Sequence, residues 1–206
     1  MKYIDLSHKL NKDTQVYPGD PKFVIEKFST ADDDYFLSNI NGSPHTGTHI
    51  DAPYHYIKNG KKVDDLDINT LIGKATILKT KREIVNDSIN IKDIDIKNPI
   101  EKIVILKTEW YKHWGNDDYF TKNPYISNEL ADMLIENKVK GVAIDTCSVD
   151  KIGETKIHKR FLKNDIWIVE NLTNLNKLSK NNYYSYFIPM NIDAEASYIR
   201  AFVKDE

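Results

Sequence analysis

The sequence predicts a mixed α/β fold in which a mostly β sheet forms the core and few helices cover it. Short runs rich in β-branched and aromatic residues, bounded by Gly, Pro, Asn or Asp, recur along the whole chain. A strong helical pattern occurs over residues 127–138. That segment leads through Lys140 and Gly141 into the apolar run 142–144, and a helix followed directly by a buried strand is typical of an α/β layer.

The strand predictions follow from local composition, because each run favours a pleated, partly buried backbone. The predicted strands span residues 2–6, 23–28, 35–40, 75–80, 103–107, 142–144, 166–169, 183–188 and 198–203. Residues 84–99 differ from these runs, since their isoleucines alternate imperfectly with polar residues. We expect this segment to form an irregular edge strand or a loop that leads to a strand.

Two segments are predicted to be helical. In residues 127–138, Ser127 can cap the first turn and Glu129 lies where the helix dipole favours a negative charge. One apolar stripe runs along this helix, formed by Leu130, Met133 and Leu134. A second, short helix is predicted over residues 67–72, with Gly73 ending it.

Length and composition indicate one globular domain over residues 1–206, because 206 residues with a 40% hydrophobic fraction can bury a core. The net charge of −2 offers no basic excess for a nucleic-acid or membrane-surface partner. The chain has neither the apolar stretch of a secretory signal nor the roughly 18 apolar residues that span a bilayer. Its one cysteine, Cys147, excludes an intrachain disulfide, so we expect a cytoplasmic protein.

Ligand-type side chains concentrate in one segment of eleven residues. Three of the six histidines lie there with one aspartate: His45, His49, Asp51 and His55 follow one another at intervals of four, two and four positions. Imidazole nitrogens and carboxylate oxygens are ligands of Zn²⁺ and similar divalent ions. The segment therefore predicts a metal site, with an ordinary polar loop as the alternative interpretation.

No regular backbone brings these side chains to one metal ion. An extended strand rises about 3.3 Å per residue, which would place His45 and Asp51 roughly 20 Å apart. A regular helix would bring His45 and His49 together but turn Asp51 away. The chain must therefore bend, and Gly47 is the residue at which a bend costs least. Pro53 further excludes a central strand at its position.

The segment from His45 to His55, with the sequence HTGTHIDAPYH, resembles the HxGTHxDxPxH signature of the cyclase and bacterial kynurenine formamidase family. The resemblance extends to residues 17–21 (YPGDP) and 145–150 (DTCSVD), and so covers most of the chain. It implies a swivelling β/β/α-type fold, a homodimer or higher assembly, and hydrolysis of a small amide. It also implies a divalent metal centre, often of two zinc ions, with manganese as the alternative.

The resemblance assigns roles to the motif residues. It implies that His45, His49 and Asp51 bind one metal ion, that Asp51 also binds a second ion, and that His55 acts as the acid and base. A tryptophan that contacts the aromatic substrate in kynurenine formamidases corresponds to Tyr17, so Tyr17 is the expected substrate contact.

His158 and Glu170 are the candidates for the remaining ligands of the second metal ion. They are twelve positions apart, as is the second pair of metal ligands in the family. Glu170 follows the predicted strand 166–169, where a carboxylate can point into a cleft, although a glutamate at a strand end is more often merely solvated. The resemblance implies that both residues bind metal.

Several further polar and aromatic residues have open interpretations. Asp145, Ser148 and Asp150 follow the predicted strand 142–144, and either orient metal-bound histidines or form hydrogen bonds within a loop. Cys147 is expected to be inert. His8 follows the first predicted strand and lies either near the site or away from it. Three aromatic residues are expected in the core, with the pocket wall as the alternative: Phe36, Trp110 and Trp114.

The sequence therefore predicts a metal-dependent amidohydrolase. The first hypothesis is an arylformamidase of tryptophan catabolism, which converts N-formylkynurenine into kynurenine and formate by a metal-activated water with His55 as acid and base. The second is an isatin-hydrolase-like enzyme that opens a cyclic amide or lactone. The third is a metal-binding module without catalysis. His55 separates the third from the others, because a pure metal binder does not need it beside the ligands.

Overall fold

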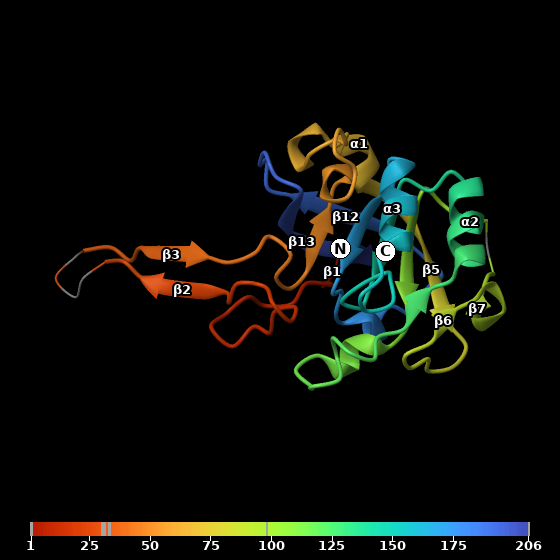
Figure 1. The fold of residues 1–206 in the computed structure, drawn as a ribbon, viewed down its shortest axis with the longest axis horizontal. Helices are drawn as coiled ribbons and strands as arrows, with labels where there is room; N and C mark the ends of the chain where they lie inside the picture. The colour runs from red at the N-terminus through yellow and green to blue at the C-terminus, as the bar shows by residue number, and fades with distance from the viewer. Residues whose placement is uncertain (1, 30–31, 33, 98, 206) are drawn as a thin grey trace.

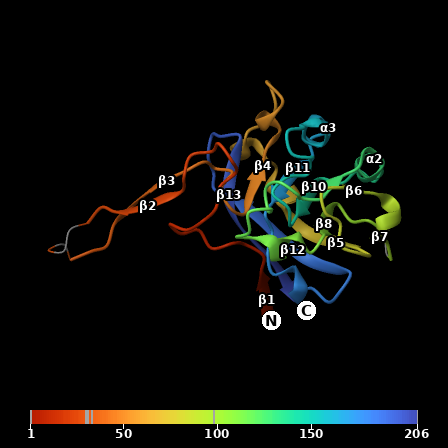
Figure 2. The same ribbon diagram turned by 60° about the horizontal axis from the view of Figure 1, so that its bottom comes forward.

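The structure is a computed structural model that describes residues 2–29, 32, 34–97 and 99–205. Seven strands close into a barrel-like sheet. Figure 1 shows the whole molecule, and Figure 2 labels the strands of the barrel. In order around the barrel they are β4 (His49–Asp51), β11 (Trp167–Glu170), β10 (Gly141–Ile144), β8 (Ile103–Lys107), β5 (Ile72–Thr80), β12 (Asn182–Pro189) and β13 (Ala196–Asp205). The pairing of β13 with β4 closes the ring. Because β5, β8, β10 and β11 are parallel and the other pairings antiparallel, the predicted mixed sheet is confirmed.

Short strands add to this barrel. The remaining strands are β1 (Lys2–Asp5), β2 (Val24–Lys27), β3 (Ser38–Asn41), β6 (Ser88–Ile89), β7 (Ile94–Asp95) and β9 (Tyr125–Ile126). β1 pairs with β13, β7 with the end of β5, and β6 with β9, while β2 and β3 form a separate hairpin. Every predicted strand overlaps an observed one, and β6 and β7 form the irregular strand expected within residues 84–99.

Three α-helices occur in the described residues: α1 (Ile68–Leu71), α2 (Asn128–Glu136) and α3 (Lys156–Lys163). The two predicted helices correspond to α1 and α2, and the Ser127 hydroxyl accepts the N–H of Leu130 at 3.1 Å as the predicted cap. α3 was not predicted. Short 3₁₀ segments cover Pro53–His55, Val63–Asp65, Ile91–Asp93, Trp110–His113 and Leu175–Lys177. No helix among the described residues has the length and apolar character to cross a bilayer.

Alternate residues of the barrel strands enter two separate cores. Side chains such as Ile50, Ile105 and Ala143 point inward and fill the barrel together with Trp167 and Phe187. Their neighbours point outward and form a second core beneath α2 and α3, which includes Val104, Val142, Ile168, Leu134 and Phe161. Figure 2 shows these two helices on one side of the barrel. The strands at this point are buried on both faces, as expected for parallel strands covered by helices.

The hairpin β2–β3 projects away from the barrel in both views (Figures 1 and 2). At its base, the ring of Phe23 packs edge-to-face against Tyr198 with centroids 5.9 Å apart. Farther out the hairpin carries exposed apolar side chains, and Phe36 is 94% exposed. The prediction for Phe36 was therefore wrong, since it lies neither in the core nor at a pocket wall. Trp110 is buried and Trp114 partly buried in one aromatic cluster, as predicted.

Candidate metal centre

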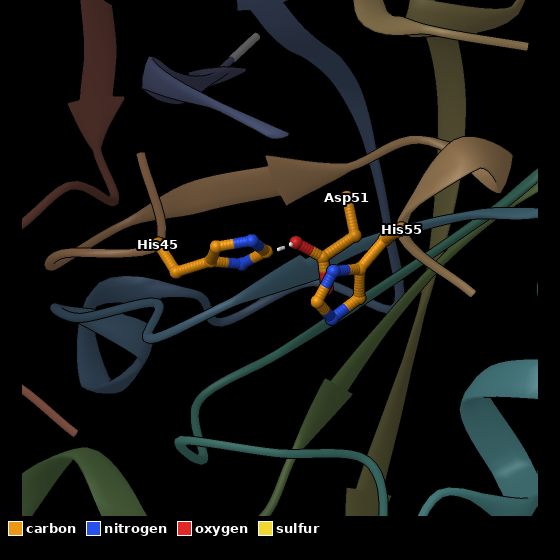
Figure 3. Close-up of side chains that lie close together, drawn as sticks. All are labelled: His45, Asp51 and His55. Atoms are coloured by element: carbon orange, nitrogen blue, oxygen red, sulfur yellow. Dashed lines mark ion pairs between the residues drawn. The ribbon is translucent and has the colours of Figure 1, made fainter. Parts of the chain in front are cut away.

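A bend at Gly47 and a turn at Pro53 gather the histidines of the motif around β4. Gly47 has a φ of +66°, a conformation that favours glycine, and a Cβ there would lie 2.6 Å from Cδ2 of Leu10. Pro53 opens the 3₁₀ turn that ends at His55. The rings of His45 and His55 consequently lie 4.4 Å apart beside Asp51, as Figure 3 shows. The predicted bend is confirmed.

Asp51 lies at the centre of the cluster and is 1% exposed. One carboxylate oxygen lies 2.9 Å from Nδ1 of His45 and 3.4 Å from Nε2 of His49. The other oxygen lies 3.4 Å from Nε2 of His158. A single carboxylate thus faces three imidazoles, two from its own segment and one from α3.

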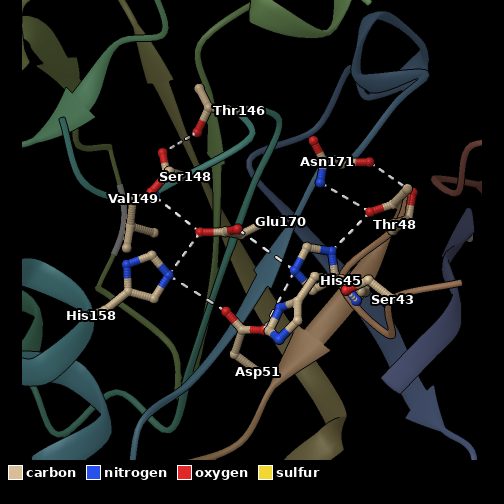
Figure 4. Close-up of polar contacts among 12 residues, drawn as sticks. Ser43, His45, Thr48, Asp51, Thr146, Ser148, Val149, His158, Glu170 and Asn171 are labelled. Carbon is tan, nitrogen blue, oxygen red and sulfur yellow. Dashed lines mark hydrogen bonds and ion pairs between the residues drawn. The ribbon is translucent and has the colours of Figure 1, made fainter. Parts of the chain in front are cut away.

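Glu170 joins the cluster because it is the last residue of β11, which pairs with β4. In this pairing Glu170 lies opposite His49. Its carboxylate oxygens lie 3.1 Å from Nε2 of His158 and 3.6 Å from Nε2 of His49. Figure 4 shows that Asp51 and Glu170 point toward one another from neighbouring strands, with His158 across from both. Residues more than a hundred positions apart in the chain therefore meet at one point.

The donor set fits a divalent ion. Nε2 of His49 and both oxygens of Asp51 are buried and, among the described residues, have no hydrogen-bond partner. Unpaired buried groups of this kind are costly unless something binds them. Ligand atoms converge to within 4.8 Å in two groups, His45–Asp51–His55 and His49–Asp51–Glu170. His55 thus lies close to His45 and Asp51, and Asp51 belongs to both groups. The ring of His49 also contacts that of His45, with centroids 5.0 Å apart.

The second ring nitrogen of each buried histidine is held by an acceptor. Nδ1 of His49 lies 2.8 Å from the carbonyl oxygen of Gly47, which can only accept, so Nδ1 donates its proton there and Nε2 faces the cluster. Nδ1 of His158 lies 2.7 Å from Oδ2 of Asp150. The same carboxylate accepts two backbone N–H groups of the first turn of α3. Asp150 therefore orients His158, one of its two predicted roles.

His45 is held from two sides by carboxylates. Besides the contact to Asp51, its Nε2 lies 3.5 Å from an oxygen of Glu195, just before β13. Burial acts to lower the pKa of His45, but Asp51 and the other carboxylates outweigh it and raise the pKa to about 9. Glu195 was not singled out in the sequence, because only the pairing of β13 with β4 brings it here.

Burial and neighbouring charges also act in opposite directions on the pKa values of Asp51, His158 and His55. Burial opposes the charged form of Asp51, yet His45 and His49 hold its pKa well below its usual value. For His158 burial is likewise outweighed, by Glu170 first, and its pKa is raised well above normal. His55 differs, because burial dominates and lowers its pKa to about 4, despite the opposing field of Asp51. At neutral pH His55 is therefore a neutral base.

A cavity of about 320 Å³ opens above the cluster. Tyr17 lines it, and its ring packs edge-to-face against Phe120 with centroids 5.8 Å apart. Tyr56, which the sequence analysis did not single out, also lines the cavity and packs against His55. The cavity thus combines the cluster with an aromatic wall, which suits a small aromatic ligand.

Other candidates lie outside the cluster or are inert. Asp145 accepts the N–H and hydroxyl of Thr108, so it forms hydrogen bonds locally instead of orienting a histidine. Ser148 lines the cavity. Burial raises the pKa of the Cys147 thiol, which keeps it protonated as expected for an inert cysteine. His8 stacks on Trp114 at 3.9 Å and does not line the cavity.

Sequence comparisons place the chain among known proteins. Residues 4–151 match the model of the family named Cyclase. The chain is 30% identical to the kynurenine formamidase of Bacillus thuringiensis subsp. konkukian over 208 residues, which covers 98% of this chain and 97% of that protein. It is also 30% identical to the kynurenine formamidase of Bacillus anthracis, with the same coverage of both chains.

Solved structures agree in fold. Isatin hydrolase A from Ralstonia solanacearum superposes with a TM-score of 0.84 at 21% identity, covering 98% of this chain and 91% of that one. A predicted metal-dependent hydrolase from Bacillus stearothermophilus superposes with a TM-score of 0.79 at 23% identity, covering 98% and 97%. Identities at this level show a shared fold, and the swivelling β/β/α-type fold expected from the sequence is the one observed.

Proposed function

Because the chain belongs to the cyclase family, we propose that it is an arylformamidase-type hydrolase that converts N-formylkynurenine into kynurenine and formate. It is a metal-dependent hydrolase of a carbon–nitrogen bond and acts on a small molecule. The observation that carries the proposal is the buried cluster around Asp51, which lies at the floor of a cavity with an aromatic wall. The cluster contains two groups of possible metal ligands, and the carboxylate of Asp51 belongs to both.

We propose that His45, His49, Asp51, His158 and Glu170 hold two divalent ions, with Asp51 shared between them. Zn²⁺ suits this set of nitrogen and carboxylate ligands, and Mn²⁺ is the alternative. When bound, such ions supply Lewis acidity and lower the pKa of a water molecule toward 7. The two carboxylates offset the positive charge of the ions.

His55 is the proposed acid and base. Burial keeps its imidazole neutral, so it can accept a proton from the attacking water. The new C–O bond forms at the formyl carbon while the C–N bond breaks, and His55 returns the proton to the departing amine nitrogen. The products are formate and the free aromatic amine, which balances the atoms of one water molecule. Tyr17 and Phe120 would hold the ring of the substrate.

The test is the variant His55→Ala, with His113→Ala as the control because His113 lies away from the cavity. We expect His55→Ala to lower kcat on N-formylkynurenine by about 10²- to 10⁴-fold. Metal content, measured by elemental analysis, should stay unchanged, which separates a proton-transfer role from a ligand role. If turnover of every tested amide survives in His55→Ala, the mechanism is wrong.

Isatin is the comparison substrate in the same assay, because the second hypothesis is the opening of a cyclic amide. Both substrates would be tested with the metal-free enzyme reconstituted with Zn²⁺ or Mn²⁺. We expect hydrolysis of the formamide with either ion. Clear isatin opening without formamide hydrolysis would overturn the proposal.

We further propose that the enzyme is a cytoplasmic homodimer. The exposed apolar side chains of the hairpin β2–β3 support the dimer, because they lie on an extension that leaves the barrel. The free thiol of Cys147 supports a reducing compartment.

A further inference from the structure

Two side chains of opposite charge line the cavity from different parts of the chain. Asp20 ends a turn in which its N–H bonds to the carbonyl of Tyr17. Lys151 begins a second turn, closed by the N–H of Glu154 bonding to the Lys151 carbonyl. Neither side chain forms an ion pair or side-chain hydrogen bond within the described residues, and they do not pair with each other. Outside the Asp51 cluster, the cavity therefore offers one cation, Lys151, and two carboxylates, Asp20 and Glu154.

The same cavity also has an apolar wall. Tyr17 and Phe120 meet edge-to-face, and Ile152 adds an aliphatic surface next to Lys151. The cavity thus has three features that can bind a substrate. The candidate metal centre can bind an amide, the aromatic wall can bind a ring, and Lys151 and Asp20 can bind groups of opposite charge. A neutral aryl formamide would use the first two and leave both charges without a partner.

We propose that Lys151 and Asp20 select substrates whose ring carries a zwitterionic amino-acid side chain, Lys151 binding its carboxylate and Asp20 its ammonium group. This inference rests on the proposed formamide hydrolysis. N-formylkynurenine is such a substrate, whereas formanilide and isatin carry neither charge. Complementary charges at the edge of a site act mainly on selectivity and encounter, so the effect belongs in KM and not in kcat.

Glu154 should affect the KM in the opposite direction to Lys151. It lies on the same turn as Lys151 and also lines the cavity without an ion pair among the described residues. Its negative charge opposes the binding of a carboxylate near Lys151. Replacing Glu154 with Gln should therefore lower the KM for a substrate with a carboxylate, the opposite of what Lys151→Met should do.

The experiment tests four variants, Lys151→Met, Asp20→Asn, Glu154→Gln and Lys156→Met, with four formamides. The substrates are N-formylkynurenine, its analogue without the carboxylate, its analogue without the ammonium group, and formanilide. Lys151→Met should reduce kcat/KM by about 3- to 10-fold only for substrates that carry the carboxylate. Asp20→Asn should do the same only for those that carry the ammonium group. Lys156→Met is the matched control, because Lys156 is an exposed lysine that does not line this cavity.

The outcomes separate the inference from the proposed function. If the parent enzyme hydrolyses N-formylkynurenine and both Lys151→Met and Asp20→Asn reduce all four substrates equally, or none, charge selection is overturned while the formamidase function stands. If the parent enzyme hydrolyses none of the four formamides, the proposed function itself fails. Melting temperatures of all variants should match that of the parent, since Asp20 and Lys151 contact solvent.

Discussion

At the scale of single residues, the site depends on the acceptor that contacts the second ring nitrogen of each imidazole. His49 is held by a backbone carbonyl, His158 by the buried carboxylate of Asp150, and His45 by the partly exposed carboxylate of Glu195. His45, His49 and Asp51 could be chosen from their spacing in the sequence, and His158 from the family resemblance. Of the supports, Asp150 was one of the predicted candidates. The Gly47 carbonyl and Glu195 were not, because a carbonyl carries no sequence signal and Glu195 reaches the site only through strand pairing.

Asp150 is expected to control metal retention through His158. Its carboxylate fixes the ring of His158 and closes the first turn of α3. We predict that Asp150→Asn weakens metal affinity by about 10- to 100-fold, the usual cost of removing such a support. Competition with a chelating dye measures this affinity. The exposed Asp64→Asn is the control, and equal metal affinity in the two variants would remove Asp150 from this role.

Asp145 should make stability depend on pH. Burial raises its pKa to about 6, while hydrogen bonds from Thr108 oppose the shift only partly. Because the folded state binds this proton more tightly than the unfolded state, the stability it contributes is lost as pH rises through about 4 to 6. We predict that the stability of Asp145→Asn relative to the parent rises by about 1 kcal/mol between pH 5 and pH 7.5.

Urea denaturation at both pH values, with a chelator present, measures this difference. The chelator keeps metal binding from contributing its own pH dependence. A constant difference between parent and variant would mean that Asp145 does not titrate in this range.

At the scale of elements, the apolar strands of the barrel were predictable, and the short elements β4 and α3, which carry candidate ligands, were less so. β8, β10 and β11 are mostly apolar and contain several β-branched residues, so composition identifies them. β4 has only three residues, and two of them, His49 and Asp51, are proposed metal ligands. α3 was missed because its eight residues are mostly polar, and only Ile157, Phe161 and Leu162 form its buried stripe with His158.

Gly47 links these elements, since it bends the chain between His45 and β4. We predict that Gly47→Ala destabilises the protein by about 1–3 kcal/mol, because alanine is strained at positive φ and its Cβ would collide with Leu10. Gly115→Ala is the control for the backbone, as Gly115 has a φ of +90° and open space around it.

Adding Leu10→Ala to the parent protein and to the Gly47→Ala variant separates the collision with Leu10 from the backbone strain at position 47. We expect the double variant to recover part of the lost stability in urea denaturation, relative to the sum of the single changes. Strictly additive effects would show that the bend does not depend on Leu10.

At the scale of the whole molecule, the closed barrel explains why the site draws on the full length of the chain. The C-terminal strand β13 pairs with β4, which places Glu195 next to His45. β11 pairs with the other edge of β4 and supplies Glu170. The order of strands around a barrel depends on long-range pairing, so local patterns could predict the mixed sheet but not which strands flank β4.

Among the described residues, the strands β2 and β3 pair with each other and not with the barrel sheet. A two-stranded hairpin is marginally stable alone in water, and this one exposes the cross-strand pair Ile25 and Ile40 on one face. In the proposed homodimer, the second copy of the chain would cover this surface. We predict that Phe36→Ser combined with Ile40→Ser halves the mass measured by sedimentation at micromolar concentration. Ile68→Ser, an exposed apolar residue on α1, should leave it unchanged. A parent protein that sediments as a monomer, or a double variant that keeps the dimer mass, would exclude the hairpin as the dimer contact.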